Sequence, residues 1–237
     1  MPTESDSTLS PHSLKKMAAE KSLEYIQDGH TVGLGTGSTV KYLLEALAPC
    51  VKAGLRIQGV PTSRETATLA IQLHIPILPD EDAWEIDVAI DGADEVDSHF
   101  NLIKGGGGAL LREKIIAANA KQFVVIVDEG KQVTSLGVSF PLPVEVVPFG
   151  WPSTMRAIER LGYQATRRVR DGHAIVTDNH NYVFDVQGKA LENPSMLAQQ
   201  FKDIPGVVET GLFVGMTSIL IVGTPQGAVI HRHPSTV

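Results

Sequence analysis

The amino-acid sequence predicts an α/β fold: a doubly wound, mainly parallel, Rossmann-like sheet with a smaller, inserted, ferredoxin-like α+β domain. Two observations support this prediction. In the first half of the 237-residue chain, short apolar segments typical of strands alternate with segments of helical periodicity, which predicts βαβ units. After Pro141 the predicted order changes to β-α-β-β-α-β, the signature of a ferredoxin-like module.

The first half of the chain contains the elements of the parallel sheet. Apolar residues recur at helical spacing from Leu14 to about Ile26, and Asp28-Gly29 ends this helix. Each later strand is a short apolar run that stops at glycine or at polar turn residues. We expect strands at 30–35, 55–60, 85–97 (broken at Asp91-Gly92) and 123–130, and helices at 39–48, 62–73 and 109–120.

The second half contains the inserted domain and the return to the first sheet. Proline opens and glycine closes the helix WPSTMRAIERLG, and Asp-Gly and Asp-Asn pairs mark turns between short strands. We expect helices at 151–162 and 193–204, and strands at 144–149, within 167–186, at 206–214 and, returning to the first sheet, within 218–230.

These elements give a division into two domains and an arm. The Rossmann-like catalytic domain is expected at 14–140 and 217–237, the inserted α+β domain at 141–216, and a disordered N-terminal arm at 1–13.

The composition excludes several classes of partner. A formal net charge of −7 disfavours nucleic acid, whose phosphates need a basic surface, but permits a small anion held by a few lysines. No apolar run reaches the roughly 20 residues that span a bilayer, and the polar start MPTESDSTLSPHS is not typical of a signal peptide. The single cysteine, Cys50, cannot form an internal disulfide. A cytoplasmic protein is therefore expected.

The segment GLGTGSTV, after the first predicted strand, does not match the common nucleotide-binding motifs. Ser38 stands where the dinucleotide fingerprint G-x-G-x-x-G needs its last glycine, and Gly59-Val60-Pro61 ends the second strand without the acidic residue that binds ribose. The pattern G-x-x-x-x-G-K-[ST] is also absent. The sequence therefore disfavours NAD and P-loop nucleotide sites.

The same loop suits a phosphate monoester. Backbone N–H groups and the hydroxyls of Thr36, Ser38 and Thr39 lie at a predicted helix N-terminus, whose dipole favours an anion. A tight turn followed by a Ser or Thr helix cap explains these residues about equally well.

The segment DGADEVD brings carboxylates to the end of a buried strand, where open α/β sheets bind ligands. Asp91 and Asp94 are candidates for hydrogen bonding sugar hydroxyls or moving their protons. For Glu95 and Asp97 we prefer turn chemistry and helix capping. A metal site is disfavoured because no histidine or repeated ligand spacing accompanies these carboxylates.

The segment IKGGGGALLREKI contains four consecutive glycines between Lys104 and a predicted helix that carries Glu113. A glycine run lets backbone amides approach a ligand closely, which a flexible connector inside a domain would not need. We therefore expect Lys104 and Glu113 to face a ligand across this loop. With 100° per residue, Glu113 points away from the stripe that we expect to be buried, namely Leu111, Ile115 and Ala118.

Together these segments resemble the ribose-5-phosphate isomerase type A family. KQVTSLG, FPLPVEVVP, TDN, IPGVVETGLF and GTPQG match as well, so the resemblance runs from about Leu14 to Gly227. It implies interconversion of D-ribose 5-phosphate and D-ribulose 5-phosphate in the pentose phosphate pathway without a metal or other cofactor, by a homodimer or homotetramer. It also implies that Glu113 is the base, and that the substrate contacts are Thr36, Gly37, Ser38, Thr39, Asp91, Gly92, Ala93, Asp94, Lys104, Gly105, Gly106, Gly107, Lys131 and, at the phosphate, Lys15.

The residues fit this chemistry independently of the resemblance. Glu113 can remove a proton beside a carbonyl and return it one carbon away, from one face of a planar enediolate. Lys104 and the glycine-loop N–H groups can stabilise the oxyanion, and Asp91 can move the hydroxyl proton. The alternative is a sugar-phosphate sensor without catalysis, but such sensors usually carry a DNA-binding domain, for which the predicted arm is too short.

Overall fold

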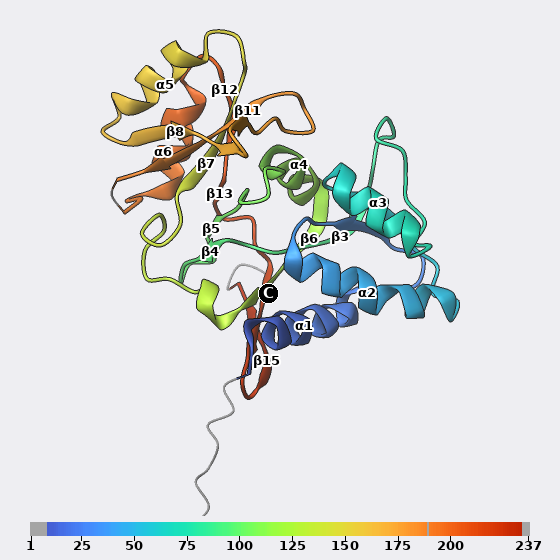
Figure 1. Ribbon diagram of the computed structural model, residues 1–237. Helices are drawn as coiled ribbons and strands as arrows, with labels where there is room; N and C mark the ends of the chain where they lie inside the picture. The colour runs from blue at the N-terminus through green and yellow to red at the C-terminus, as the bar shows by residue number, and fades with distance from the viewer. Residues whose placement is uncertain (1–8, 189, 234–237) are drawn as a thin grey trace, which may run out of the picture.

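A computed structural model describes residues 9–188 and 190–233 of the chain. Six strands form a central sheet in the order β15-β14-β6-β3-β1-β2 (Figure 1). All neighbours in this sheet are parallel except β14 and β15, which form an antiparallel hairpin. The strands are β1 (Thr31–Leu34), β2 (Gln58–Pro61), β3 (Ile86–Asp91), β6 (Ala120–Asp128), β14 (Ile219–Thr224) and β15 (Gly227–Arg232).

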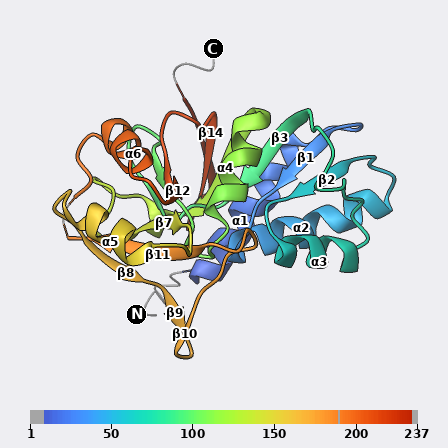
Figure 2. The ribbon, with the colours of Figure 1, turned by 90° about the horizontal axis from the view of Figure 1, so that it is seen from above.

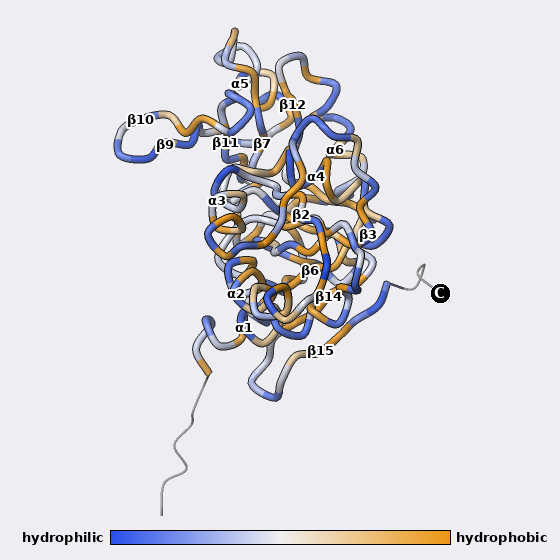
Figure 3. Tube along the Cα trace, turned by 90° about the vertical axis from the view of Figure 1, so that its right-hand side faces the viewer, coloured by the Kyte–Doolittle hydropathy of each residue, from blue (hydrophilic) through white to orange (hydrophobic). Residues whose placement is uncertain are grey.

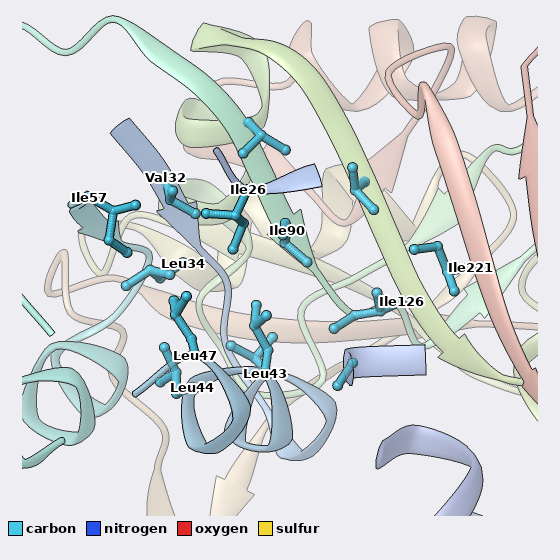
Figure 4. Close-up of a cluster of buried hydrophobic side chains, with 14 of the residues drawn as sticks. Ile26, Val32, Leu34, Leu43, Leu44, Leu47, Ile57, Ile90, Ile126 and Ile221 are labelled. Atoms are coloured by element: carbon cyan, nitrogen blue, oxygen red, sulfur yellow. The ribbon is translucent and has the colours of Figure 1, made fainter. Parts of the chain in front are cut away.

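Helices cover both faces of this sheet because alternate residues of its buried strands point to opposite sides. In β6, Val124 and Ile126 belong to the cluster under α1, α2 and α3, whereas Val125 and Val127 face α4. Figure 4 shows Leu43, Leu44 and Leu47 of α2 packed against the first of these faces. The helices are α1 (Pro11–Ser22), α2 (Ser38–Lys52), α3 (Arg64–Gln72) and α4 (Leu110–Asn119), with short 3₁₀ turns η1 (Leu23–Tyr25) and η2 (Glu129–Lys131).

A second unit lies beside the parallel sheet, with α4 between the two (Figures 1 and 2). Its antiparallel sheet has the order β12-β7-β11-β8, which is the arrangement of a βαββαβ module. The α/β fold class, with a mainly parallel sheet and additional antiparallel sheets, is therefore confirmed. The elements are β7 (Leu142–Val146), α5 (Trp151–Glu159), β8 (Gln164–Arg167), β11 (Tyr182–Gln187), α6 (Pro194–Lys202) and β12 (Val207–Thr210). The exact domain boundaries stay a prediction.

Two small sheets accompany these units. Strands β13 (Leu212–Phe213), β5 (Leu102–Ile103) and β4 (Glu95–Val96) form an antiparallel sheet that lies between the two larger ones (Figure 1). A hairpin of β9 (Val169–Arg170) and β10 (His173–Ala174) projects from the second unit, and its tip is hydrophilic (Figure 3). Strands β4, β9, β10 and β13 lie within segments predicted to contain strands, at 85–97, 167–186 and 206–214, whereas β5 lies outside the predicted strands.

The first helix begins three residues earlier than predicted. Ser10 caps α1 by accepting a hydrogen bond from the Ser13 N–H, and Pro11 occupies the first helical position. Residues 11–13 are therefore helical rather than part of the predicted arm, whose residues 1–8 lie outside the described part of the chain.

Helix α1 lies against the last strands of the chain. The backbone of β14 approaches it so closely that a Cβ on Gly223 would lie 2.0 Å from the Leu14 carbonyl oxygen. The position of Lys15, the next residue, therefore depends on β14. Among the described residues, no helix has the length and apolar character needed to cross a bilayer.

Candidate active site

The predicted site residues meet at the carboxyl ends of β1 and β3. Strand order reverses here, because β2 follows β1 on one side and β3 lies on the other, and open α/β sheets bind ligands at such a point. One cavity is lined by every predicted site residue except Asp91: Lys15, Thr36, Gly37, Ser38, Thr39, Gly92, Ala93, Asp94, Lys104, Gly105, Gly106, Gly107, Glu113 and Lys131.

The first turn of α2, which begins at Ser38 and lines the cavity, has N–H groups that no side chain caps. Gly37, at φ 113°, is the N-cap of α2, and no side chain caps this helix. The alternative in which Ser or Thr serves as a helix cap is therefore wrong. Instead, the hydroxyl of Ser38 accepts a hydrogen bond from Lys15 Nζ at 3.1 Å. A helix N-terminus with unpaired amides and a nearby lysine suits a phosphate dianion.

Thr36 is held by hydroxyls of residues that are not among the predicted site residues. Its Oγ1 lies 2.6 Å from Thr62 Oγ1 and donates to Ser63 Oγ at 2.8 Å, while Thr66 Oγ1 donates to the Gly35 carbonyl at 2.7 Å. The Thr36 N–H donates to Asp91 Oδ1 at 3.1 Å. Because both donors of Thr36 are engaged within the protein, this residue holds the loop in shape.

Lys104 lies between two carboxylates in a fully buried cluster. Its Nζ is 3.0 Å from Asp91 Oδ2 and 3.3 Å from Glu113 Oε2, and it donates to the Gly92 carbonyl at 2.5 Å. The three charged side chains are at most 4% exposed. The structure brings Lys104 and Glu113 together at one site, whereas the expectation that both face a ligand across the glycine loop stays a prediction.

The predicted buried face of the helix that carries Glu113 is wrong. Glu113 lies on the buried face of α4, together with Leu110, Ile116 and Ala117, whereas Ile115 is 43% exposed. The cause is a close approach to β1, since a Cβ on Gly33 would lie 2.5 Å from Ile116 Cγ2. This packing turns Glu113 inward, toward Lys104.

Burial changes the acidity of the whole cluster. It raises the pKa of Glu113 to about 8; the Lys104 ammonium opposes this shift, and the charges of Asp91 and Asp94 add to it. Burial also raises the pKa of Asp91, against the effect of Lys104. For Lys104, burial favours the neutral amine, but the two carboxylates outweigh this effect and its pKa is raised. A proton is therefore retained near Glu113 at neutral pH.

Because Glu113 retains a proton in the folded protein, the free energy of unfolding is expected to depend on pH. Between about pH 4.5 and 8, the folded protein holds a proton at Glu113 that the unfolded chain has lost, so the free energy of unfolding decreases as pH rises through this window. In Glu113→Gln this contribution is absent, and the decrease will be smaller. Denaturant unfolding of both proteins at about pH 5, 7 and 9 measures the difference. Equal decreases in both proteins would contradict the raised pKa of Glu113.

The loop of four glycines is fixed by Asp94. The Gly106 N–H donates to Asp94 Oδ2 at 2.7 Å, and a Cβ on Gly106 would lie 2.6 Å from Asp94 Oδ1. Gly105, at φ +106°, has a backbone conformation that side chains disfavour. Asp94 therefore shapes the loop as well as lining the cavity.

The remaining acidic residues have structural contacts. Glu95 is 2% exposed and accepts hydrogen bonds from the N–H groups of Gly137, Ser139 and Phe140, so it holds a distant loop rather than a local turn or a helix end. Asp97 accepts from the N–H groups of His99 and Asn101, as the turn prediction expects. Within 9–188 and 190–233, no group of three or more His, Cys, Asp or Glu residues is placed to bind a metal.

The chain matches a known family over most of its length. Residues 58–227 match the family model of ribose 5-phosphate isomerase A (phosphoriboisomerase A), which is more than half of the chain. The chain belongs to the ribose 5-phosphate isomerase A family. The predicted family resemblance is therefore confirmed.

Curated and structural relatives carry the same family name. Ribose-5-phosphate isomerase A 1 of Oceanobacillus iheyensis is 48% identical over 218 residues, covering 92% of this chain and 97% of the relative. A solved D-ribose-5-phosphate isomerase in complex with phospho-erythronic acid matches with a TM-score of 0.91 at 39% identity, covering 94% of this chain and 100% of that one. Ribose 5-phosphate isomerase A of Methanocaldococcus jannaschii matches with a TM-score of 0.90 at 38% identity, with the same coverage.

Proposed function

We propose that the protein is an aldose-ketose isomerase that interconverts D-ribose 5-phosphate and D-ribulose 5-phosphate through an enediolate, in the non-oxidative pentose phosphate pathway. The observation that carries the proposal is the buried Lys104, held between Glu113 and Asp91 at one cavity with an open helix N-terminus. The related isomerase that binds phospho-erythronic acid supports it, because that ligand combines a phosphate with a planar carboxyl group.

In the proposed mechanism the phosphate lies against the start of α2, with Lys15 and Lys131 as counter-charges. Glu113 removes the proton from C2 of the aldose, and the electron pair forms the enediolate. Lys104 stabilises the charge that develops on the oxygen. Glu113 then returns the proton to C1, while a hydroxyl proton moves between the two oxygens.

We propose that Asp91 and Asp94 transfer the hydroxyl proton between the two oxygens. Asp94 lines the cavity directly, whereas Asp91 contacts the site through Lys104. We propose that Asp94 exchanges that proton with the substrate directly and that Asp91 does so through Lys104, and that both assist opening of the sugar ring.

Ketose formation tests the proposal directly. The purified protein is mixed with ribose 5-phosphate, and ribulose 5-phosphate is followed over time. Sustained turnover supports the isomerase. Binding without turnover would instead support the sugar-phosphate sensor, although three charged side chains buried together, with shifted pKa values, are typical of catalytic sites.

The activity is expected to increase with pH across the neutral range. Glu113 must be ionised to act as the base, and its pKa in the free protein is about 8. Because kcat/KM reports the ionisation of the free enzyme, its profile should rise between about pH 6 and 9 with a midpoint near 8. A profile already level at about pH 6 would contradict this assignment.

Chelators are expected to leave the rate unchanged. Lys104 supplies the positive charge that a metal would otherwise place at the oxyanion, and it is already paired with the proposed base. The rate is measured before and after treatment with EDTA and after dialysis. Loss of activity that one specific added metal restores would defeat this mechanism.

We further propose a cytoplasmic homodimer or homotetramer. The single cysteine suits a reducing compartment. Phe149, which is 91% exposed, is an apolar side chain available for contact between copies. Light scattering coupled to gel filtration measures the number of subunits, and a monomer at micromolar concentration would contradict the proposal.

A further inference from the structure

We propose that Arg168, in the inserted segment, is a positioning residue that directs the Gly107 N–H toward the reacting oxygen of the substrate. The inference rests on the isomerase function proposed above. Arg168 directly follows β8, at the base of the β9–β10 hairpin (Figure 2). Its Nη1 donates to the carbonyl oxygens of Gly105, at 2.9 Å, and Gly106, at 3.0 Å.

The planarity of the peptide unit converts these two contacts into a direction for the opposite N–H groups. In a trans peptide, the C=O and the N–H of the next residue point in opposite directions, and no cis peptide is found among the described residues. Since Arg168 holds the Gly105 carbonyl, the Gly106 N–H must point away from Arg168. It does so, and donates to Asp94 Oδ2 at 2.7 Å.

The next peptide unit follows the same rule. Arg168 also holds the Gly106 carbonyl, so the Gly107 N–H points to the side away from the guanidinium. Within the described part of the chain this N–H has no hydrogen-bond partner. Gly107 lines the same cavity as Lys104 and Glu113. An unpaired donor at this place can bind the oxygen on which charge develops.

Arg168 is itself rigidly held, which a positioning residue requires. Its Nε donates to Asp185 Oδ2 at 2.9 Å and its Nη2 to Asp185 Oδ1 at 2.5 Å, a bidentate pair. Its backbone N–H donates to the Val183 carbonyl of β11 at 2.8 Å. Its side chain is only 15% exposed. Within the glycine loop the Gly108 N–H donates to the Gly105 carbonyl, and Asp94 accepts from the Gly106 N–H. The Gly106 carbonyl, which sets the direction of the Gly107 N–H, is held by Arg168 from the inserted unit.

Two arginine variants separate this role from a general effect of charge or folding. Arg168→Met removes both hydrogen bonds to the loop carbonyls. Arg167→Met is the matched control, because Arg167 is its neighbour with the same charge but lies over the rings of Trp151 and Tyr182, at 4.5 and 5.2 Å. We expect kcat for ribose 5-phosphate to fall roughly 10- to 100-fold in Arg168→Met with KM changed less than about threefold, and to stay within about twofold in Arg167→Met.

Inhibitor binding gives a readout that a merely structural role would not produce. Phospho-erythronic acid probes the oxygen end of the site, and inorganic phosphate probes the phosphate end. In Arg168→Met the inhibition constant of phospho-erythronic acid should increase by about the same factor as kcat falls, while that of inorganic phosphate stays unchanged. Equal weakening of both inhibitors would overturn the inference.

A double variant separates the loss of the clamp from a folding defect caused by an unpaired Asp185. Arg168→Met leaves Asp185 without its partner, so Arg168→Met/Asp185→Asn removes both charges together. The same loss of kcat is expected in the double variant, and partial recovery in Arg168→Lys, which retains a donor. Wild-type kcat in the double variant would overturn the inference about Arg168 but not the proposed isomerase function. No turnover of ribose 5-phosphate by the unaltered protein would overturn the proposed function, and this inference with it.

Discussion

Glu113→Gln is expected to reduce kcat by about two to four orders of magnitude while substrate still binds, because an amide cannot accept the proton from C2. The substitution suits the site, since Glu113 has a pKa of about 8 and is mostly protonated at pH 7. A neutral amide of the same shape therefore replaces a mostly neutral carboxyl group. Steady-state kinetics with ribose 5-phosphate, and the affinity for phospho-erythronic acid, provide the two measurements.

Glu129→Gln is the matched control for this experiment. Glu129 lies in η2 and is exposed, yet it is close in the chain to Lys131, which lines the cavity. Its activity should stay within about twofold of the wild type. Near-normal turnover by Glu113→Gln would reject Glu113 as the base.

Lys104→Met should damage both stability and activity. It leaves Asp91 and Glu113 buried together without the ammonium that now lies 3.0 and 3.3 Å from them. Removing one partner of a buried ion pair typically costs about 3–5 kcal/mol of unfolding free energy. The loss should be smaller at low pH, where both carboxyls can take up protons. We also expect kcat to fall at least about 100-fold, because the enediolate loses its counter-charge.

Lys131→Met is the control that shows whether the loss of stability in Lys104→Met depends on the burial of Lys104 between carboxylates. Lys131 lines the same cavity but is only partly buried and has no carboxylate partner among the described ion pairs. Its loss should raise KM, as expected for a phosphate contact, and leave the unfolding free energy within about 0.5 kcal/mol of the wild type. Guanidinium unfolding at about pH 8 compares the two variants. Equal stability of Lys104→Met and the wild type would contradict the described cluster.

The order of the main elements could be predicted from sequence because long apolar segments have clear periodicity. The loop after β1 and the end of the strand at Asp91 could also be predicted to lie at the same edge of the sheet, because parallel strands align their carboxyl ends. The two-residue strand β5 could not be predicted, because it is too short to show a period. The residue-by-residue site prediction came from the family resemblance.

Helix α4 shows why its buried face could not be predicted. Leu111 with Ile115, and Leu110 with Ala117, lie at helical spacing on two different faces of the same helix. Tertiary packing decides between them, and the residue that allows it, Gly33, lies about 80 positions earlier in the chain. Arg168 and the hydroxyls around Thr36 were missed for a related reason. Each reaches its contact from a segment distant in sequence, so no local pattern indicates it.

The close approach of Gly223 to Leu14 has a consequence for biosynthesis. Helix α1, which carries Lys15, packs against β6, β14 and β15, and β14 and β15 follow every cavity-lining residue in the chain. A nascent chain that stops before residue 219 therefore lacks part of the surface on which this helix packs, even though every cavity-lining residue has been made. We expect catalytic competence to appear only after β14 has been translated and has packed against α1, so that chains terminated before β14 are inactive.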